Sequence, residues 1–301
     1  MLALITHPAY SYPFPDKHRF PMQKFRLLVD YLKQQGIATE HNLIRPGKAQ
    51  PALLSLAHDT NYIQAFCQGT LSEQALRRMG LPWSEELVKR SLISPAGTWL
   101  SAQYALKYGM ACHLAGGTHH AHHDFGSGFC IFNDLAVTAL ALIRSKKAKK
   151  VLIFDCDVHQ GDGTATILAN EENCITCSIH CEKNFPARKA QSDIDINLSK
   201  GLADIAYLDM VASTLKQCLI HQPDFVIYDA GVDIYIDDTL GLLNISLDGI
   251  RQRDKLVIET VRKLNLPLLT VIGGGYDKNE FELAKRHAIV VEELFKMKMN
   301  Y

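Results

Sequence analysis

Short apolar runs alternate with longer segments of helical periodicity along the chain. Six runs predict buried β-strands: residues 2–5, 110–115, 151–154, 174–180, 225–228 and 268–272. Most of these runs are too continuously apolar to have one face in water, which is typical of parallel strands covered on both faces.

The intervening segments predict helices. In residues 22–35, apolar positions from Phe25 to Leu32 recur at i, i+3, i+4 and i+7, and Gly36 follows as a stop signal. Residues 208–219 repeat this spacing. Strands that alternate with helices predict an α/β fold with a mostly parallel central sheet covered by helices on both faces.

Composition narrows the class of protein. With 301 residues, 47% of them hydrophobic, the chain can bury a large core, and the absence of repeats or linkers favours a single domain over residues 1–301. The 32 basic and 32 acidic residues balance, which argues against nucleic acid as a partner. No stretch approaches the roughly 20 apolar residues of a membrane span, and the N-terminus lacks a basic leader. The eight cysteines include several isolated in apolar or helical surroundings, which favours a reduced, cytoplasmic protein of undetermined oligomeric state.

Polar and glycine-rich motifs follow four of the predicted strands. They are GGTHH (116–120), DCDVHQGDG (155–163), DAGVD (229–233) and GGGY (273–276). Ligands of open α/β sheets bind beyond the carboxyl ends of the strands, so these motifs are the candidate site.

The second and third motifs predict a metal site. Asp155, Asp157 and His159 follow one another at every second position, so their side chains point to the same side if the chain is extended there. Two carboxylates and an imidazole suit a divalent ion, and Asp233 ends another strand as a further ligand. The alternative is a pair of strand-end carboxylates that cap a helix.

The remaining motifs predict proton transfer. His119 and His120 are adjacent, and burying both requires separate partners, for which Asp155 and Asp162 are the candidates. Three glycines before Tyr276 would let the backbone approach a ligand while the phenol faces the site and stabilises a developing oxyanion. The alternative for GGGY is a turn with a surface tyrosine.

Together with GSGFCIFND (126–134), the motifs in this order resemble those of the histone deacetylase family, including the acetoin-utilisation-type and acetylpolyamine deacetylases of bacteria. The resemblance begins near residues 21–26 and runs to Tyr276. Gln160, where many members have a second histidine, and residues 231–254 look most like the class IV branch.

This resemblance implies a role for each matching residue. It implies zinc ligands (Asp157, His159, Asp233), a general acid/base pair (His119, His120) with carboxylate partners (Asp155, Asp162), a carbonyl-polarising tyrosine (Tyr276), substrate-tunnel residues (Gly128, Phe129, Phe185), an internal-channel arginine (Arg26) and a structural K⁺ site (Asp155, Ser178, Ile179).

The implied activity is hydrolysis of the amide of an acylated lysine in a protein, or of a small acylated amine, with Zn²⁺ or alternatively Fe²⁺ as cofactor. Zinc polarises a carbonyl and lowers the pKa of its water towards about 7. The acyl group is acetyl or longer. Two other classes stay open: a dinuclear manganese hydrolase of the arginase type and a non-catalytic acyl-lysine binding module. A dinuclear site would need further carboxylates that bridge two metal ions. A binding module could lose Tyr276 or a metal ligand, but this chain retains Tyr276 and all of the metal ligands.

Two patterns invite other interpretations. Cys174 and Cys177 form a C-x-x-C pair, but no second pair at ribbon spacing follows, and the run reads as a buried strand. The basic run at 144–150 is interpreted as the solvated last turn of a helix.

Overall fold

The computed structural model describes residues 1–299, so the last two residues of the predicted domain lie outside the described part. Its centre is one sheet of eight parallel strands in the order β2-β1-β3-β8-β7-β4-β5-β6. The strands are β1 (Ala3–Ile5), β2 (Leu43–Ile44), β3 (Met110–His113), β4 (Val151–Asp155), β5 (Cys174–Cys181), β6 (Ile194–Leu198), β7 (Phe225–Asp229) and β8 (Leu268–Val271). The predicted α/β fold is confirmed.

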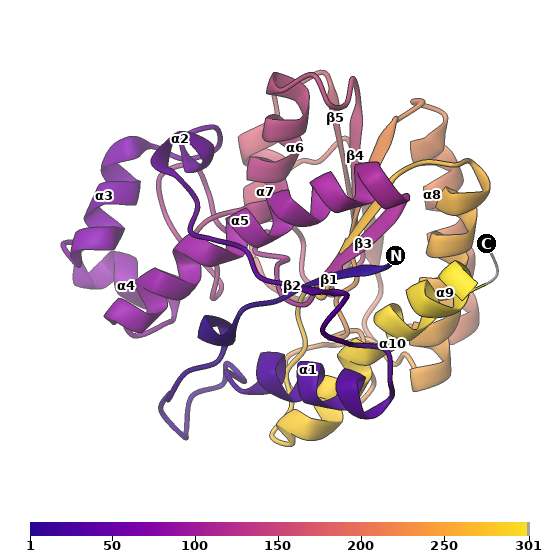
Figure 1. Cartoon of the computed structure of the whole chain (residues 1–301), viewed down its shortest axis with the longest axis horizontal. Helices are drawn as coiled ribbons and strands as arrows, with labels where there is room; N and C mark the ends of the chain where they lie inside the picture. Colours follow the sequence, from indigo (N-terminus) through magenta and orange to yellow (C-terminus); the bar gives the residue numbers. More distant parts are fainter. Residues whose placement is uncertain (300–301) are drawn as a thin grey trace.

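Helices cover both faces of the sheet (Figure 1). α5, α6 and α7 pack together on one face, and α1, α10, α9 and α8 form the layer on the other. A lobe made of α2, α3 and α4 projects to one side (Figure 1). The helices are α1 (Lys24–Gln34), α2 (Pro51–Leu54), α3 (Thr60–Gln68), α4 (Glu73–Met79), α5 (Glu85–Tyr108), α6 (Asp134–Arg144), α7 (Asp162–Leu168), α8 (Asp204–Leu219), α9 (Leu247–Lys263) and α10 (Glu280–Met299), with a short 3₁₀ turn, η1 (Pro8–Tyr10).

The central strands are apolar throughout because each of their faces packs against a helix layer. In β4, Leu152 and Phe154 belong to one hydrophobic core, and Val151 and Ile153 belong to the core on the opposite face. Successive side chains of a strand point to opposite faces, so a strand that is covered twice shows no polar alternation.

Local signals fix the ends of several helices. The long helix α5 begins where the Ser84 hydroxyl accepts a hydrogen bond from the Leu87 amide, and it ends at Gly109, whose φ of 85° is left-handed. A side-chain acceptor at the N-cap and a glycine after the last turn satisfy backbone groups that the helix itself leaves unpaired.

Several predicted boundaries need correction. The edge strands β2 and β6 were not predicted, because β2 has two residues and β6 carries polar Asp195 and Asn197 between its apolar positions. Strands β4 and β7 extend one residue further than predicted, to Asp155 and Asp229. Helix α6 ends at Arg144, so the lysines after it lie in the connection to β4 and not in a helical turn.

The topology brings the four motif-bearing strands together. β3, β8, β7 and β4 are neighbours in the middle of the sheet, and all four are parallel. Their carboxyl ends therefore open on one edge, where GGTHH, GGGY, DAGVD and DCDVHQGDG meet.

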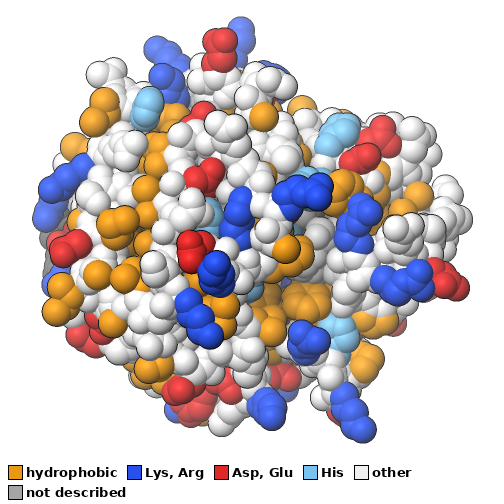
Figure 2. Space-filling view, turned by 180° about the vertical axis from the view of Figure 1, so that it is seen from behind, with side chains coloured by type: hydrophobic (Ala, Val, Ile, Leu, Met, Phe, Trp, Pro, Cys, Tyr) orange, Lys and Arg blue, Asp and Glu red, His pale blue; other side chains and the backbone are white. Residues whose placement is uncertain are grey.

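The cysteines of the described part of the chain form neither a disulfide nor a metal-binding group. Figure 2 shows basic and acidic side chains interspersed with hydrophobic ones around a central hollow. All eight cysteines are free, and Cys174 and Cys177 are buried in β5. No helix within residues 1–299 combines the length and apolar character needed to cross a membrane.

Candidate metal centre

Asp157, His159 and Asp233 converge at the carboxyl ends of β4 and β7. The Nδ1 atom of His159 lies 3.0 Å from Oδ1 of Asp157 and 3.1 Å from Oδ2 of Asp233. All three side chains are buried, and one donor atom from each lies within 4.8 Å of the other two. The structure therefore brings together two carboxylate oxygens and one imidazole nitrogen.

Backbone amides hold the two carboxylates in place. Asp157 accepts a hydrogen bond of 2.7 Å from the Gly274 amide, and Asp233 accepts one of 2.9 Å from the Val158 amide. Gly274 is required for this approach, because a Cβ atom there would overlap the carboxylate oxygens of both Asp157 and Asp233. The GGG sequence thus lets the chain after β8 lie directly against the acidic cluster.

This donor set fits a divalent metal ion. Three protein ligands of the carboxylate and imidazole types are what a catalytic zinc site uses, with a further position left for water or substrate. Burial opposes the charge on His159, yet its bonds to Asp157 and Asp233 raise the pKa of the imidazole to about 10. Burial and the charge of Asp157 raise the pKa of Asp233 to about 6. These buried acids need a cation between them, and without metal the imidazolium serves as that cation.

The tandem histidines flank this cluster and are oriented by separate carboxylates. Nδ1 of His119 lies 2.7 Å from Asp155, and Nδ1 of His120 lies 2.6 Å from Asp162. The other ring nitrogen of His119 lies 3.8 Å from Asp157. A carboxylate on Nδ1 fixes the tautomer and leaves Nε2 of each ring for the chemistry.

The two histidines differ in protonation although they are adjacent in sequence. Burial disfavours the charged form of His119, but Asp155, Asp157 and Asp229 outweigh it, and the pKa of His119 is well above its usual value. Burial and the charge of His119 lower the pKa of His120 to about 4, despite its bond to Asp162. Environments that separate two pKa values in this way supply one proton donor and one proton acceptor.

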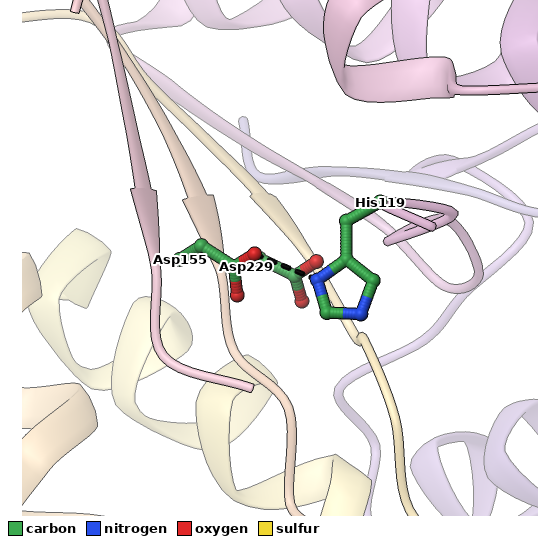
Figure 3. A group of neighbouring side chains, drawn as sticks. All are labelled: His119, Asp155 and Asp229. Atoms are coloured by element: carbon green, nitrogen blue, oxygen red, sulfur yellow. Dashed lines mark hydrogen bonds and ion pairs between the residues drawn. The ribbon is translucent and has the colours of Figure 1, made fainter. Parts of the chain in front are cut away.

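His119 also belongs to a second cluster, which is drawn in Figure 3. It consists of His119, Asp155 and Asp229, which are all buried and have donor atoms within 4.8 Å of one another. Both carboxylate oxygens of Asp229 lack a hydrogen-bond partner among residues 1–299. Burial and the neighbouring charge of Asp155 therefore raise the pKa of Asp229 well above its usual value.

Arg253 contacts the backbone of the two loops that carry the candidate metal ligands, one after β4 and one after β7. This fully buried side chain of α9 donates to the Gly231 carbonyl at 2.6 Å and to the Cys156 carbonyl at 3.4 Å. Asp254 pairs with the guanidinium at 2.9 Å. Because Cys156 lies between Asp155 and Asp157, and Gly231 two residues before Asp233, Arg253 positions the two halves of the candidate metal centre.

Tyr276 lines the same cavity as His119, His120 and Asp157. Burial and the charges of Asp157 and Asp233 raise the pKa of Tyr276 well above its usual value, so the phenol is a proton donor. Its ring centroid lies 6.3 Å from that of His159 and 5.9 Å from that of Phe129. Tyr276 faces the site and is not a surface tyrosine.

The predicted tunnel residues adjoin the histidine pair. Phe129 has a left-handed φ of 67° and lines the site cavity with Gly128. The ring of Phe185 lies 4.8 Å from that of His120, and the side chain is 45% exposed. A Cβ atom at Gly128 would press on the rings of His120 and Phe185, so glycine keeps this passage open.

Arg26 was predicted to be the internal-channel arginine, and this prediction is wrong. Its side chain is 60% exposed and pairs with Asp30 on the surface of α1. Lys24, which directly precedes Phe25 in α1, is buried. Arg90 of α5 is buried as well. These two cations line the site cavity in place of Arg26. Helix phase decides the outcome, since Lys24 and Arg26 are two residues apart and point to different sides.

The residues of the predicted K⁺ site are neighbours in the sheet. Asp155 and Ser178 are paired across β4 and β5, and Ile179 follows Ser178. The Asp155 side chain accepts from the Asp157 amide and also contacts His119, while the Ser178 hydroxyl lies 3.0 Å from His180. The K⁺ assignment stays a prediction.

Besides Arg253, Lys24 and Arg90, three polar residues of the site were not predicted from the sequence. Asp229 begins the DAGVD motif, and its place at a strand end is the signal in the sequence that points to it. His122, which the motif assignments do not include, lies 3.2 Å from Asp162, the partner of His120. Asn184 lies 3.4 Å from His159 Nε2 and donates to the Leu240 carbonyl. Nothing in the sequence near Asn184 indicated this contact.

Fold and site together define an α/β protein with a candidate metal centre at the carboxyl edge of a parallel sheet. The histone deacetylase domain matches residues 18–293, and the chain belongs to the histone deacetylase family. It is similar to an uncharacterized protein of Picosynechococcus sp., with 46% identity over 95% of this chain and 96% of that protein.

More distant relatives agree with this membership, and two solved structures share the fold. Histone deacetylase 2 of Arabidopsis thaliana is 29% identical (87% of this chain, 70% of that protein), and the acetoin utilization protein AcuC of Staphylococcus xylosus is 28% identical (88% and 74%). A crystal structure of a histone deacetylase homologue complexed with SAHA superposes with a TM-score of 0.82 and 24% identity, covering 98% of this chain and 84% of that chain. The HDA15 HD domain gives a TM-score of 0.80 at 20% identity, covering 98% and 88%. These two structures support the fold.

Proposed function

We propose that this protein is a metal-dependent deacylase that hydrolyses the amide of an acylated lysine side chain, or of a related small amine, to the free amine and a carboxylate. The observation that carries this proposal is the convergence of the Asp157–His159–Asp233 cluster, the histidine pair and Tyr276 on one cavity. Family membership supports acylated lysine as the substrate class.

Asp157, His159 and Asp233 would hold the metal, with zinc as the first candidate and ferrous iron as the alternative. A divalent ion bound there would supply Lewis-acid polarisation of the amide carbonyl and a water of lowered pKa. The site is proposed to be mononuclear, because its cluster and the His119–Asp155–Asp229 cluster share no residue among those the structure describes. A dinuclear hydrolase of the arginase type needs carboxylates that bridge both ions.

The histidine pair would move the protons of the reaction. A neutral imidazole takes a proton from the attacking water, and a protonated imidazole delivers a proton to the leaving amine nitrogen. His120, with its lowered pKa, suits the first role, and His119, with its raised pKa, suits the second. Asp155 and Asp162 hold each ring in the tautomer that these transfers need.

Tyr276 would stabilise the developing charge on the former carbonyl oxygen. Its phenol stays protonated at neutral pH and can donate a hydrogen bond to that oxygen as the tetrahedral centre forms. Phe129 and Phe185 would border the methylene stem of the substrate, because aromatic walls exclude water from an aliphatic chain.

The test is release of acetate from an acetyl-lysine peptide by zinc-loaded protein, with and without chelator. Tyr276→Phe is expected to bind zinc normally and to lower kcat by about 100- to 1,000-fold, the loss typical of one oxyanion donor. Tyr108→Phe, at an exposed position at the end of α5, is the matched control and keeps full activity. Chelator-resistant release, or a fully active Tyr276→Phe variant, would contradict the proposal.

A further inference from the structure

We infer that Asp238 is a positioning residue, which holds the phenol of Tyr276 where it can donate a hydrogen bond to the substrate oxygen. This inference rests on the proposed function and adds a residue that none of the four strand-end motifs contains. It follows from the loop in which Tyr276 lies and from the hydrogen bonds that join this loop to residues 238–241.

Tyr276 lies in the loop between β8 and α10 and directly follows three glycines. Glycine has more backbone freedom than any other residue, and Gly273 has a left-handed φ of 60°. A donor for a developing oxyanion must lie about 2.7–3.1 Å from the place of that oxygen. The place of the phenol therefore depends on contacts that hold the backbone of Tyr276.

Asp238 and Thr239 bind both polar backbone groups of Tyr276. The Tyr276 amide donates to Oδ2 of Asp238 at 2.7 Å. The Tyr276 carbonyl accepts from the Thr239 amide at 3.2 Å. Asp238 is buried, and within the described part of the chain it is not one of the residues that line the site cavity. Asp238 can therefore affect the reaction through Tyr276 without touching the substrate.

The other oxygen of Asp238 fixes the turn that presents this contact. Oδ1 accepts from the amides of Leu240 and Gly241, at 2.9 and 3.0 Å. An aspartate that binds backbone amides shortly after its own position stabilises a turn. One side chain thus holds its own turn with one oxygen and the backbone of Tyr276 with the other.

The same turn also reaches the metal cluster. The Leu240 carbonyl accepts from Asn184 at 2.7 Å, and Asn184 lies 3.4 Å from Nε2 of His159. A change at Asp238 could therefore act on Tyr276 or on a metal ligand. The experiment has to separate these two routes.

Asp238→Asn is the variant that removes the contact to Tyr276 selectively. The amide oxygen of asparagine can still accept from Leu240 and Gly241, but its NH₂ group then faces the Tyr276 amide, and two donors form no hydrogen bond. On the acetyl-lysine peptide, kcat is expected to fall by about 10- to 100-fold, because a misplacement of about 1 Å can cost that much. KM and zinc affinity are expected to stay within about twofold, because neither substrate nor metal loses a contact.

The decisive comparison repeats this substitution in the Tyr276→Phe variant. Phenylalanine keeps the ring and the backbone but has no donor, so the place of the ring no longer affects the oxyanion. Asp238→Asn is then expected to change kcat by less than about twofold, because two residues that act through one group are not additive. An undiminished loss of kcat in that background, or a zinc affinity that falls by more than about tenfold, would overturn the inference in favour of the metal ligands.

Two further variants control for the fold. Asp224→Asn is the matched control, because Asp224 also accepts backbone amides, those of Lys149 and Lys150, but lies directly before β7 and so at the opposite end of that strand from the site. It is expected to leave kcat unchanged. Asp238→Ser is the second variant if Asp238→Asn does not fold. A serine hydroxyl can keep part of the turn but offers no second oxygen to the Tyr276 amide, so kcat is expected to fall in the same way.

A fluorine NMR spectrum tests the inference without turnover. In protein labelled with meta-fluorotyrosine, the resonance of Tyr276 is the one that Tyr276→Phe removes. Asp238→Asn is expected to shift or broaden this resonance and to leave that of Tyr108 in place. An unchanged Tyr276 resonance would overturn the inference. If the wild-type protein cleaves no peptide, the deacylase proposal fails, and the spectrum still decides whether Asp238 positions Tyr276.

Discussion

Two His/Asp clusters lie side by side at the edge of the sheet and differ in how their carboxylates are partnered. In the Asp157–His159–Asp233 cluster, each carboxylate accepts a backbone amide and contacts the shared imidazole. In the His119–Asp155–Asp229 cluster, Asp155 is fully engaged, whereas both oxygens of Asp229 are unpartnered within residues 1–299 (Figure 3).

The difference teaches that residue type alone does not make a metal site. In the first cluster, backbone amides hold both carboxylates and one imidazole lies between the two acids, which suits replacement of a proton by a metal ion. In the second cluster the imidazole is already hydrogen-bonded to Asp155, and burial favours a neutral Asp229. We therefore expect the first cluster to bind the metal and the second to tune His119.

The largest expected effect is on metal affinity. Asp233→Asn keeps the shape of the side chain but removes a charged ligand, so zinc affinity is expected to fall by more than about 100-fold, beyond the 10- to 100-fold typical of residues that only orient a ligand. Asp229→Asn is the matched variant in the second cluster and is expected to bind one zinc with unchanged affinity. Competition titration against a chromogenic chelator measures both.

The reverse result would break the comparison. If Asp229→Asn lost zinc as strongly as Asp233→Asn, the second cluster would be part of the metal site, and a dinuclear centre would have to be reconsidered. Thermal unfolding of the metal-free variants checks that each is folded.

The next effect is the pH dependence of zinc binding. The metal needs a neutral imidazole, and the pKa of His159 is raised to about 10, so binding displaces one proton at neutral pH. Zinc affinity is expected to rise about tenfold per pH unit from pH 6.5 to 8.5. Below pH 6 the slope becomes steeper, because Asp233, with a pKa of about 6, also takes up a proton.

Calorimetry in buffers of different ionisation enthalpy measures the released protons directly. Asp229→Asn is expected to leave this slope unchanged, because Asp229 belongs to the other cluster. A zinc affinity that does not vary between pH 6.5 and 8.5 would show that His159 is already neutral in the metal-free protein.

Much of this arrangement could be predicted from the sequence, because strand ends and polar motifs are local signals. Four apolar runs, each followed by a motif, located β3, β4, β7 and β8. The order of the motifs then carried the family resemblance, which the domain match confirms. The pairing of β8 between β3 and β7 makes these ends converge, and no single segment encodes that convergence.

The errors concern properties that depend on packing between distant segments. Arg26 and Lys24 are equally basic in the sequence, and only the orientation of α1 against the cavity decides which of them is buried. Asn184 reaches His159 from a loop 25 residues away. In the sequence, Asp229 is an ordinary acid at a strand end. Only the fold places Gly117 and Gly273 directly against its carboxylate and leaves both of its oxygens without a hydrogen-bond partner among residues 1–299.

The smallest expected effect is on stability and concerns Asp229 itself. The pKa of Asp229 is raised in the folded protein, so its contribution to stability is fully present below the unfolded value of about 3.9 and is lost as pH rises towards the folded value. Asparagine does not titrate. The Tm of Asp229→Asn is therefore expected to lie a few degrees above that of the wild-type protein at pH 8, and the difference is expected to be smaller at pH 5. A stability gain of about 1 kcal/mol corresponds to a rise in Tm of about 2–4 °C. Thermal unfolding at both pH values measures this gain, with Asp16→Asn at an exposed position as the control.

The contrary outcome is a Tm of Asp229→Asn that falls below that of the wild-type protein at pH 8 but not at pH 5. That result would mean that Asp229 is ionised and held by a cation, and the two clusters would then be alike.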